Sequence, residues 1–180
     1  DAVVAITTPV AQGAMALAKD TPVIFCAVTD PVKAGVVTDY EVTDKGMTGT
    51  TDAVNVDKIM ELALEITPKV KSVGYIYNSG EDNSVSNLAK LKEFCESNNL
   101  KLEEASISSS ADLQMAANTI LEKVDMLFVA NDNTVAEAMP VLMKEAIAAK
   151  KPVYVGADSM VMDGGFATLG IDYTDLGKET

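Results

Sequence analysis

The sequence of 180 residues contains no histidine and no arginine. Most general acid–base and nucleophilic mechanisms use histidine, and planar two-point binding of carboxylate or phosphate groups uses arginine. Carboxylates, lysine or a metal-bound water remain as catalytic groups, so the two absences lower the expectation of an enzyme without abolishing it. We therefore expect a protein that is not an enzyme.

Positive charge is scarce, because 14 lysines face 27 Asp and Glu residues, for a net charge of -13. Binding to nucleic-acid phosphates depends on clustered Lys or Arg, so we expect no nucleic-acid partner. Cysteine is scarce too, and neither Cys26 nor Cys95 lies in a CxxC or metal-ligand spacing. We interpret both as buried thiols and expect no metal.

Nucleotide-binding motifs and membrane-spanning runs are also missing. The sequence has no GxxxxGK[ST], and its glycine-containing loops "NSGEDNS" and "MDGGFATLG" do not give GxGxxG. These absences leave phosphate cradling weakly supported, and we expect no cofactor. No apolar run reaches membrane-spanning length.

Apolar runs typical of strands alternate with helical periodicities along the chain. This alternation predicts an α/β fold with parallel sheets flanked by helices. Strands are expected at 2–6, 22–28, 71–78, 101–107, 126–130, 152–157 and 166–171. Several of these runs are apolar on both faces, as buried parallel strands are.

Helices are expected at 56–66, 82–98 and 113–121, where apolar residues recur at spacings of three and four. A fourth helix follows Thr134 and contains Pro140, which predicts either an irregular first turn or a kink. Residues 31–54 break the alternation, since they are rich in Gly, Thr and Asp. That composition predicts a crossover between two lobes.

Polar side chains cluster where the predicted strands end. The loops after parallel strands gather at one edge of a sheet, which is where ligands bind in open α/β folds. One capping residue per junction is routine, whereas "NDNT" and "NSGEDNS" offer several, and this excess indicates a ligand. The candidate ligand-binding residues are Thr7, Thr8, Thr29, Asp30, Tyr77, Asn78, Glu81, Asn83, Ser84, Asn131, Asp132, Asn133, Thr134, Asp158 and Ser159.

Other interpretations of these residues stay open. Several of them would cap the helices that follow, and Pro9 is favoured at the first position of a helix after Thr7 and Thr8. A second alternative is a Mg²⁺ or phosphoryl-aspartate centre, which would be built from Asp30, Asp132 and Asp158.

Four motifs of the chain are specific enough to compare with known families, namely "TDPV.AG", "YN..E.NS", "DNTV" and "G.DYTDLG". The segments that contain them closely resemble the substrate-binding proteins of ABC importers, in the branch with tryptophan- and tyrosine-binding lipoproteins. The resemblance covers essentially all 180 residues. It implies the type I periplasmic-binding-protein fold, in which two α/β lobes clamp a ligand between them. By this similarity, residues 1–50 and 150–180 form the first lobe and residues 51–149 form the second.

The resemblance also implies a cellular role. It predicts an extracytoplasmic protein that binds a small polar ligand, an aromatic amino acid above all, and delivers it to an ABC permease. Family members begin with further βα units and a lipoprotein signal. We therefore expect a first lobe incomplete at its N-terminus, and a lipid anchor on the missing part as the link to the membrane.

An amino-acid ligand assigns roles to the candidates. Thr7, Thr8 and Thr29 are expected to bind its carboxylate, since no arginine is present. The ammonium group needs a carboxylate or carbonyl partner, with Asp132 the first choice and Asp158 the second.

Other candidates come from the second lobe. Asn78, Glu81, Asn83 and Ser84 would close from that side. Tyr77 either offers a face to an aromatic ligand or packs in the core.

Competing functions remain at this point. An effector-sensing domain of a regulator would have the same two-lobed fold, and the cleft residues also suit a sugar or a nucleoside. An α/β enzyme would need a catalytic group in the cleft, for which Asp132 is the candidate.

Overall fold

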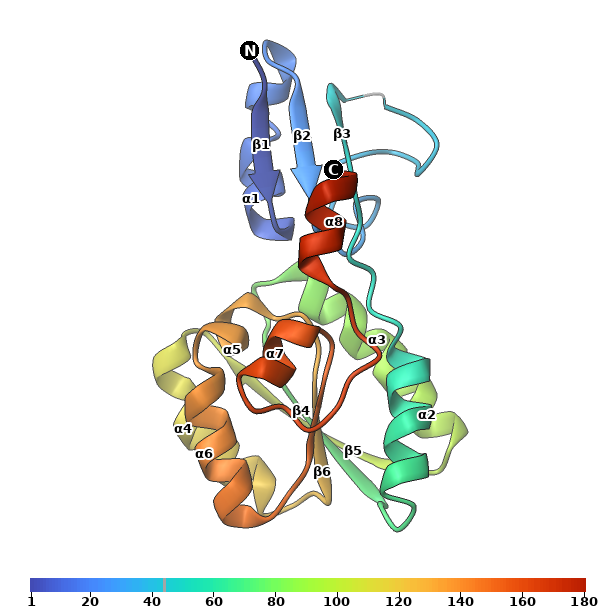
Figure 1. Cartoon of the computed structure of the whole chain (residues 1–180), viewed down its shortest axis with the longest axis vertical. Coiled ribbons are helices and arrows are strands. Elements are labelled where there is room, and N and C mark those ends of the chain that lie inside the picture. Colours follow the sequence, from blue (N-terminus) through green and yellow to red (C-terminus); the bar gives the residue numbers. More distant parts are fainter. Residues whose placement is uncertain (44) are drawn as a thin grey trace.

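The computed structural model describes residues 1–43 and 45–180, and its strands form two separate parallel sheets (Figure 1). The smaller sheet has the order β1-β2-β3, and the larger has the order β5-β4-β6-β7. We call the parts built around them the smaller lobe and the larger lobe. This arrangement confirms the predicted α/β class with parallel sheets flanked by helices.

The smaller lobe is formed mainly by the first fifty residues. Its elements are β1 (Val3–Ile6), α1 (Thr8–Ala14), the 3₁₀ helix η1 (Leu17–Lys19), β2 (Val23–Cys26) and β3 (Met47–Gly49). Pro9 stands in the first turn of α1, where its missing N–H leaves no helical hydrogen bond unmade. Ala5, Phe25 and Met47 share one buried core with residues of α1.

The larger lobe contains the rest of the chain up to residue 162. Its strands are β4 (Ser72–Asn78), β5 (Lys101–Ile107), β6 (Met126–Val129) and β7 (Val153–Val155). Its helices are α2 (Val56–Ile66), α3 (Asp82–Ser97), the 3₁₀ helix η2 (Ser110–Asp112), α4 (Leu113–Leu121), α5 (Asn133–Glu137), α6 (Met139–Ala149) and α7 (Asp158–Met162).

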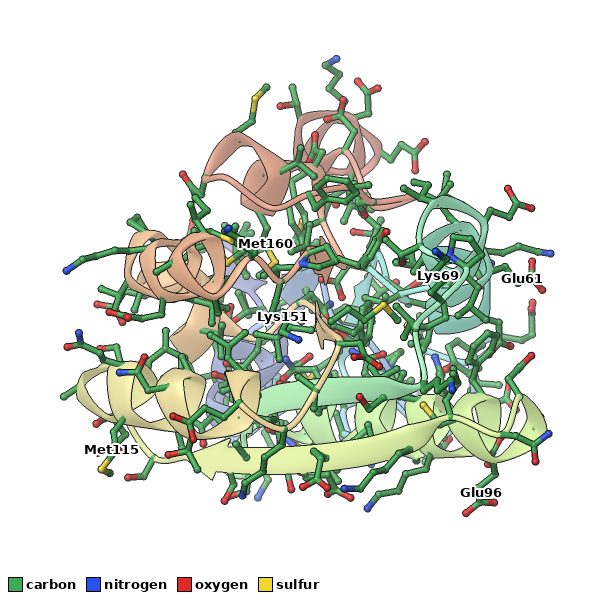
Figure 2. All side chains as sticks on the ribbon, turned by 90° about the horizontal axis from the view of Figure 1, so that it is seen from below. Glu61, Lys69, Glu96, Met115, Lys151 and Met160 are labelled. Carbon is green, nitrogen blue, oxygen red and sulfur yellow. The ribbon has the colours of Figure 1, made fainter. Side chains whose placement is uncertain are left out.

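The central strands of the larger sheet are buried on both faces. Successive residues of a strand point to opposite sides. In β6, Met126 and Phe128 join the core cluster formed with α2 and α3, while Leu127 and Val129 join the one formed with α4 and α6. Figure 2 shows this lobe from below, with helices on either side of its strands. The burial confirms the prediction that strands apolar on both faces are internal.

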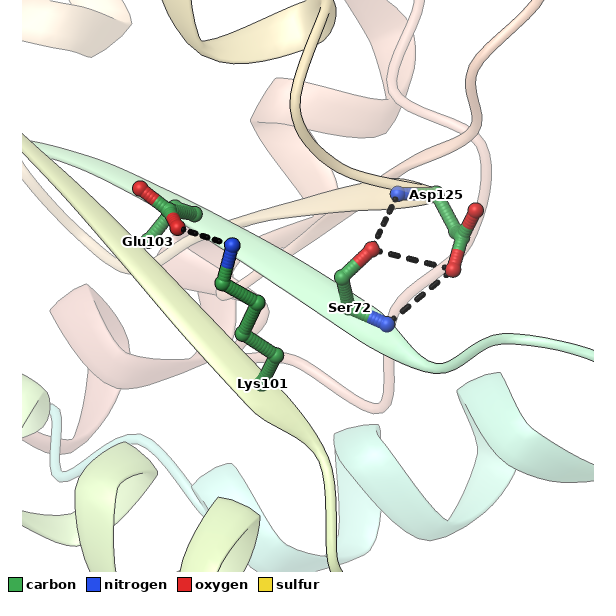
Figure 3. Close-up of polar contacts among 4 residues, drawn as sticks. All are labelled: Ser72, Lys101, Glu103 and Asp125. Atoms are coloured by element: carbon green, nitrogen blue, oxygen red, sulfur yellow. Dashed lines mark hydrogen bonds and ion pairs between the residues drawn. The ribbon is translucent and has the colours of Figure 1, made fainter.

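The amino ends of β4 and β6 are tied together on the side away from the smaller lobe. Asp125 Oδ2 accepts hydrogen bonds from the backbone N–H of Ser72 at 3.0 Å and from its hydroxyl at 3.0 Å (Figure 3). The hydroxyl oxygen of Ser72 accepts from the N–H of Asp125 in return. On the edge strand β5, Lys101 pairs with Glu103 at 2.7 Å. The contacts between Ser72 and Asp125 therefore join two strands at the edge opposite the predicted site, whereas the Lys101–Glu103 pair lies within one strand.

Two segments join the lobes. One is residues 50–55, which run from β3 to α2, and the other leads from α7 to α8 (Tyr173–Glu179), which lies beside the smaller lobe (Figure 1). Thr180, after α8, donates a hydrogen bond to Cys26 Sγ at 3.2 Å. The carboxyl ends of both sheets therefore face the same space between the lobes.

Three sequence expectations differ from this structure. The crossover predicted at 31–54 contains β3, which pairs with β2, while residue 44 within it lies outside the described residues. Residues 166–171 form isolated bridges, Tyr154 with Ala167 and Ala157 with Ile171, in place of the predicted strand. The predicted lobe boundary at 150 also differs, because β7 pairs with β6 in the larger sheet.

Pro140 lies at a break between two helices. Helix α5 ends at Glu137, Ala138 serves as its C-cap and as the N-cap of α6, and Pro140 stands in the first turn of α6. Its missing N–H is one that a helix start leaves unbonded in any case. The sequence predicted either an irregular first turn or a kink at Pro140, and the irregular first turn is the better description of this break.

Candidate functional site

A cavity of about 370 Å³ lies between the two lobes at the carboxyl ends of their strands. Residues from β1, α1, β2, α3, α5, α7 and α8, and from the loops that join them, reach its walls. The lining residues are Ile6, Thr7, Thr8, Cys26, Ala27, Thr29, Asp52, Asn83, Asn131, Asp132, Asn133, Ala136, Ala157, Ser159, Met160, Tyr173 and Gly177.

The structure brings together about half of the predicted residues. Those that line the cavity are Thr7, Thr8, Thr29, Asn83, Asn131, Asp132, Asn133 and Ser159. Those outside its lining are Asp30, Tyr77, Asn78, Glu81, Ser84, Thr134 and Asp158. The second group divides into residues that support the lining and residues with separate local roles.

Asn131 connects the two lobes at the cavity. Its Nδ2 donates to Thr29 Oγ1 at 2.8 Å and to Asp52 Oδ2 at 2.7 Å. On the other side, its Oδ1 accepts a hydrogen bond from Asn87 Nδ2 at 2.8 Å, which holds the amide against α3. All four side chains are buried. The contact therefore joins the lobes through protein atoms alone.

Asp132 is fully buried and already accepts three hydrogen bonds. Its Oδ2 accepts from the N–H of Asn78 at 2.7 Å and from the hydroxyl of Ser84 at 2.6 Å. Its Oδ1 accepts from the N–H of Val135 at 2.9 Å, which makes Asp132 the N-cap of α5. Burial raises the pKa of this carboxyl, although the three donors act in the opposite direction. Asn78 and Ser84 thus support Asp132 from behind the lining.

Glu81 accepts hydrogen bonds from Asn133 and Thr134, the last two residues of "NDNT". Its carboxylate accepts from the N–H and side chain of Asn133, at 3.0 and 2.6 Å, and from those of Thr134, at 3.1 and 2.8 Å. Burial opposes ionisation of Glu81 more than any other single effect, but these donors together lower its pKa. Much of the polar excess that indicated a ligand therefore joins the start of α3 to the start of α5.

Two cavity residues have backbones in the left-handed region. Thr7, which precedes α1, has φ 80°, and Ala27, which follows β2, has φ 56°. Side chains other than glycine rarely adopt positive φ, and such strain costs about 1–3 kcal/mol where it occurs. Strain of this kind clusters at binding and active sites, so both positions fit a functional cavity.

Three predicted residues have local roles away from the cavity. Asp30 accepts from the N–H of Lys33 at 3.0 Å and from the hydroxyl of Tyr40 at 3.1 Å. Tyr77 stacks on Tyr75, with ring centroids 5.3 Å apart, and packs against the core. Asp158 begins α7 and accepts a hydrogen bond from the N–H of Ser159.

Sequence reasoning missed two polar residues of the cavity, Asp52 and Tyr173. Asp52 accepts from Thr29 at 2.8 Å and from the hydroxyl of Tyr173 at 3.0 Å, in addition to Asn131. Burial raises the pKa of Asp52 against these donors. Asp52 lies in the segment predicted as a crossover, and Tyr173 lies in the quoted motif "G.DYTDLG", which was the available signal.

The charge of the cavity is negative. Asp52 and Asp132 line it, and no lysine of the described residues does. Over residues 1–43 and 45–180, no group of three or more His, Cys, Asp or Glu side chains is placed to hold a metal ion. Within the same ranges, no helix combines the length and apolar character that crossing a membrane requires.

Comparison with protein families gives a match over the full chain. The model described as "ABC transporter substrate binding protein" matches residues 1–180. A curated tyrosine-binding protein from Clostridioides difficile is 39% identical over 177 residues, which is 98% of this chain and 51% of that protein. The chain therefore spans about half the length of this relative.

Solved structures give the same picture. An ABC domain from Streptococcus pneumoniae in complex with L-Trp is 37% identical and has a TM-score of 0.95, with 98% of this chain and 60% of that chain covered. A substrate-binding protein with adhesive properties from Clostridium difficile, in its ligand-free, open structure, is 40% identical and has a TM-score of 0.71. That match covers 100% of this chain and 61% of the other. The likeness confirms the predicted two-lobed fold.

Proposed function

The chain belongs to the ABC transporter substrate binding protein family, and from this premise we propose that it binds an aromatic amino acid in the cavity between its lobes. In this proposal the protein is the extracytoplasmic solute-binding component of an ABC importer, and its partner is the permease. The observation that carries the proposal is the cavity itself, which combines an apolar wall with a buried polar edge.

The size and walls of the cavity support this ligand class. Small-molecule sites typically enclose roughly 300–1,000 Å³, and the cavity of about 370 Å³ lies in that range. Its apolar residues are Ile6, Ala27, Ala136, Ala157 and Met160. Three of them are alanines, whose small side chains leave room for a ring. Met160 is buried within the larger lobe (Figure 2).

Threonines of the smaller lobe supply donors for the carboxylate of the ligand. Thr7 and Thr8 stand at the start of α1 and line the cavity. The Thr8 oxygen accepts from the N–H of Thr29, so its own O–H remains as a donor. The Thr29 hydroxyl is committed to Asp52 and Asn131, so it positions the site without donating to the ligand.

The arrangement of the lobes supports a closed state. Two relatives have nearly equal sequence identity to this chain but differ in structural similarity to it. The TM-score is 0.95 for the L-Trp complex and 0.71 for the ligand-free, open structure. We infer that the lobes here are in the ligand-holding position. Because a ligand bound by both lobes favours closure, closure would tell the permease that the protein is loaded.

Calorimetric titration with L-tyrosine, L-tryptophan and L-phenylalanine tests the proposal. We expect saturable binding of at least one of them by the wild-type chain. Since the chain has no tryptophan, a change in the fluorescence of L-tryptophan on binding gives an independent signal. Substitution Ala136→Leu places extra volume in the cavity and is expected to weaken binding by about tenfold or more.

Ala148→Leu is the matched control, because it adds the same volume to an exposed position of α6. It should bind like the wild type. Binding of a sugar or a nucleoside, with no response to any of the three amino acids, would contradict the proposed ligand class and leave the fold as it is.

A further inference from the structure

Three buried side-chain oxygen atoms of the described residues lack a hydrogen-bond partner. They are Asn83 Oδ1, Asn87 Oδ1 and Thr168 Oγ1. Of these residues, Asn83 lines the cavity between the lobes, and it is only 3% exposed. Buried polar atoms are normally paired, so an unpaired acceptor in a cavity wall indicates a group that a ligand would bring.

The orientation of the Asn83 amide is fixed by its neighbours. Its Nδ2 donates to the carbonyl oxygen of Asn131 at 3.0 Å and to Glu81 Oε2 at 3.2 Å. A rotation of the amide by 180° would place Oδ1 against a carbonyl and a carboxylate, which can only accept. Oδ1 is therefore held as the free acceptor.

The surroundings of Asn83 decide which donor fits. The Ser84 hydroxyl donates to Asp132 and accepts from Asn83 Nδ2 at 3.4 Å, so the amide and the buried Asp132 carboxylate are linked through one residue. Asp132 brings negative charge to this wall, and no lysine of the described residues lines the cavity. A cationic N–H donor is favoured here, whereas a ligand carboxylate would be repelled.

We propose that Asn83 Oδ1 accepts a hydrogen bond from the ammonium group of the bound amino acid, while Asp132 contributes charge from behind. This assignment rests on the proposed function and changes the expected role of Asp132, whose oxygens already accept three hydrogen bonds. It makes Asn83 the residue that selects α-amino acids over analogues without the amino group.

Paired ligands test the assignment. Affinities of the full chain are measured for L-tyrosine and 3-(4-hydroxyphenyl)propionate, and for L-tryptophan and indole-3-propionate, which differ only by the amino group. The wild type should prefer each amino acid strongly. In Asn83→Leu, which removes the acceptor but keeps a similar shape, the ratio of the two affinities should fall by about tenfold to hundredfold.

Asn87→Leu is the control. Asn87 is also buried, also has an unpaired Oδ1 and also donates to the Asn131 network, but it does not line the cavity. This variant should weaken the binding of both ligands of a pair equally and leave the ratio of their affinities unchanged. If Asn83→Leu does not fold, as judged by circular dichroism, Asn83→Ala removes the acceptor with a smaller, apolar side chain and gives the same ratio test.

Two results would overturn the assignment and can be told apart. An unchanged ratio in the Asn83 variants, with the wild type still preferring the amino acid, would place the ammonium group elsewhere and leave the proposed function standing. Failure of the wild type to bind any of the amino acids would overturn the proposed function and the assignment together.

Discussion

Asp132 is held by donors from three elements, the N–H of Asn78 in β4, the hydroxyl of Ser84 in α3 and the N–H of Val135 in α5. Each donor would lose its partner if the carboxylate were removed. Leaving a buried donor unpaired costs about 1–3 kcal/mol, which is more than a typical hydrogen bond contributes. We therefore assign Asp132 mainly to holding the cavity wall in place.

Asp132→Asn tests this role. The amide keeps one oxygen but presents an NH₂ group to one of the donors, so the free energy of unfolding should fall by about 2 kcal/mol at pH 7 in urea titration. Asp163→Asn, an exposed position after α7, removes the same charge and should leave stability nearly unchanged. Loss of amino-acid binding at unaltered stability would instead support direct contact between Asp132 and the ligand.

The raised pKa of Asp132 predicts a pH dependence of stability that can also be measured. Burial raises it above the ordinary value of 3.8, so near that pH the folded state holds the proton more tightly than the unfolded state. The contribution of this group to stability therefore falls as pH rises from about 3.8 through the folded pKa. Asp132→Asn should remove this part of the pH dependence.

At the scale of elements, the amino ends of β4 and β6 depend on one carboxylate. Asp125 Oδ2 accepts from the N–H of Lys71 at 2.9 Å as well as from Ser72. The hydrogen bond from Lys71 is the main reason that the pKa of Asp125 is lowered, and Ser72 adds to it. Strand pairing at this edge is thus tied to an ionised side chain.

Asp125→Asn should lower the free energy of unfolding by about 1–2 kcal/mol at pH 7. Because folding lowers the pKa of Asp125, its ionised carboxylate stabilises the folded state at pH values above 3.8, the pKa in the unfolded chain. This stabilisation is lost as the pH falls through the pKa of the folded state. The difference between wild type and variant, measured in urea from pH 7 down to pH 3, should therefore shrink on acidification. Asp20→Asn, at an exposed position, is the control. A difference that stays constant with pH would contradict this assignment.

At the scale of the whole molecule, Asn131 links the lobes without help from a ligand. Its amide donates to Thr29 in the smaller lobe and to Asp52 in the connecting segment, and it is held from behind by Asn87. These buried contacts hold the two lobes together. In the proposed function, closure would be the combined result of this link and of the bound ligand.

Asn131→Ala should shift the ligand-free protein toward an open form. The radius of gyration from small-angle X-ray scattering should increase, and amino-acid affinity should fall by about tenfold to hundredfold, because hydrogen bonds to a buried carboxylate are lost. Asn118→Ala removes the same side chain from an exposed position of α4 and should change neither quantity. An unchanged radius together with weakened binding would mean that Asn131 contacts the ligand instead.

The sequence by itself determined the elements whose pattern is local. The spacing of Ile59, Met60 and Ala63 predicts α2, and the unbroken apolar run 126–130 predicts a buried strand, because burial on one or two faces leaves a periodic trace in the chain. The polar residues at strand ends predicted the edge on which the cavity lies. The resemblance of motifs then predicted the family.

Tertiary structure alone decided which polar residues face the cavity. Glu81 and Asn83 are two residues apart, yet Glu81 takes its donors from Asn133 and Thr134 while Asn83 keeps an acceptor free. Asp52 reaches the site through pairing of β3 with β2, a short strand that leaves no clear period in the sequence. Partners far apart in the chain settle such roles, because a polar side chain is available to a ligand only where the fold has not already used it.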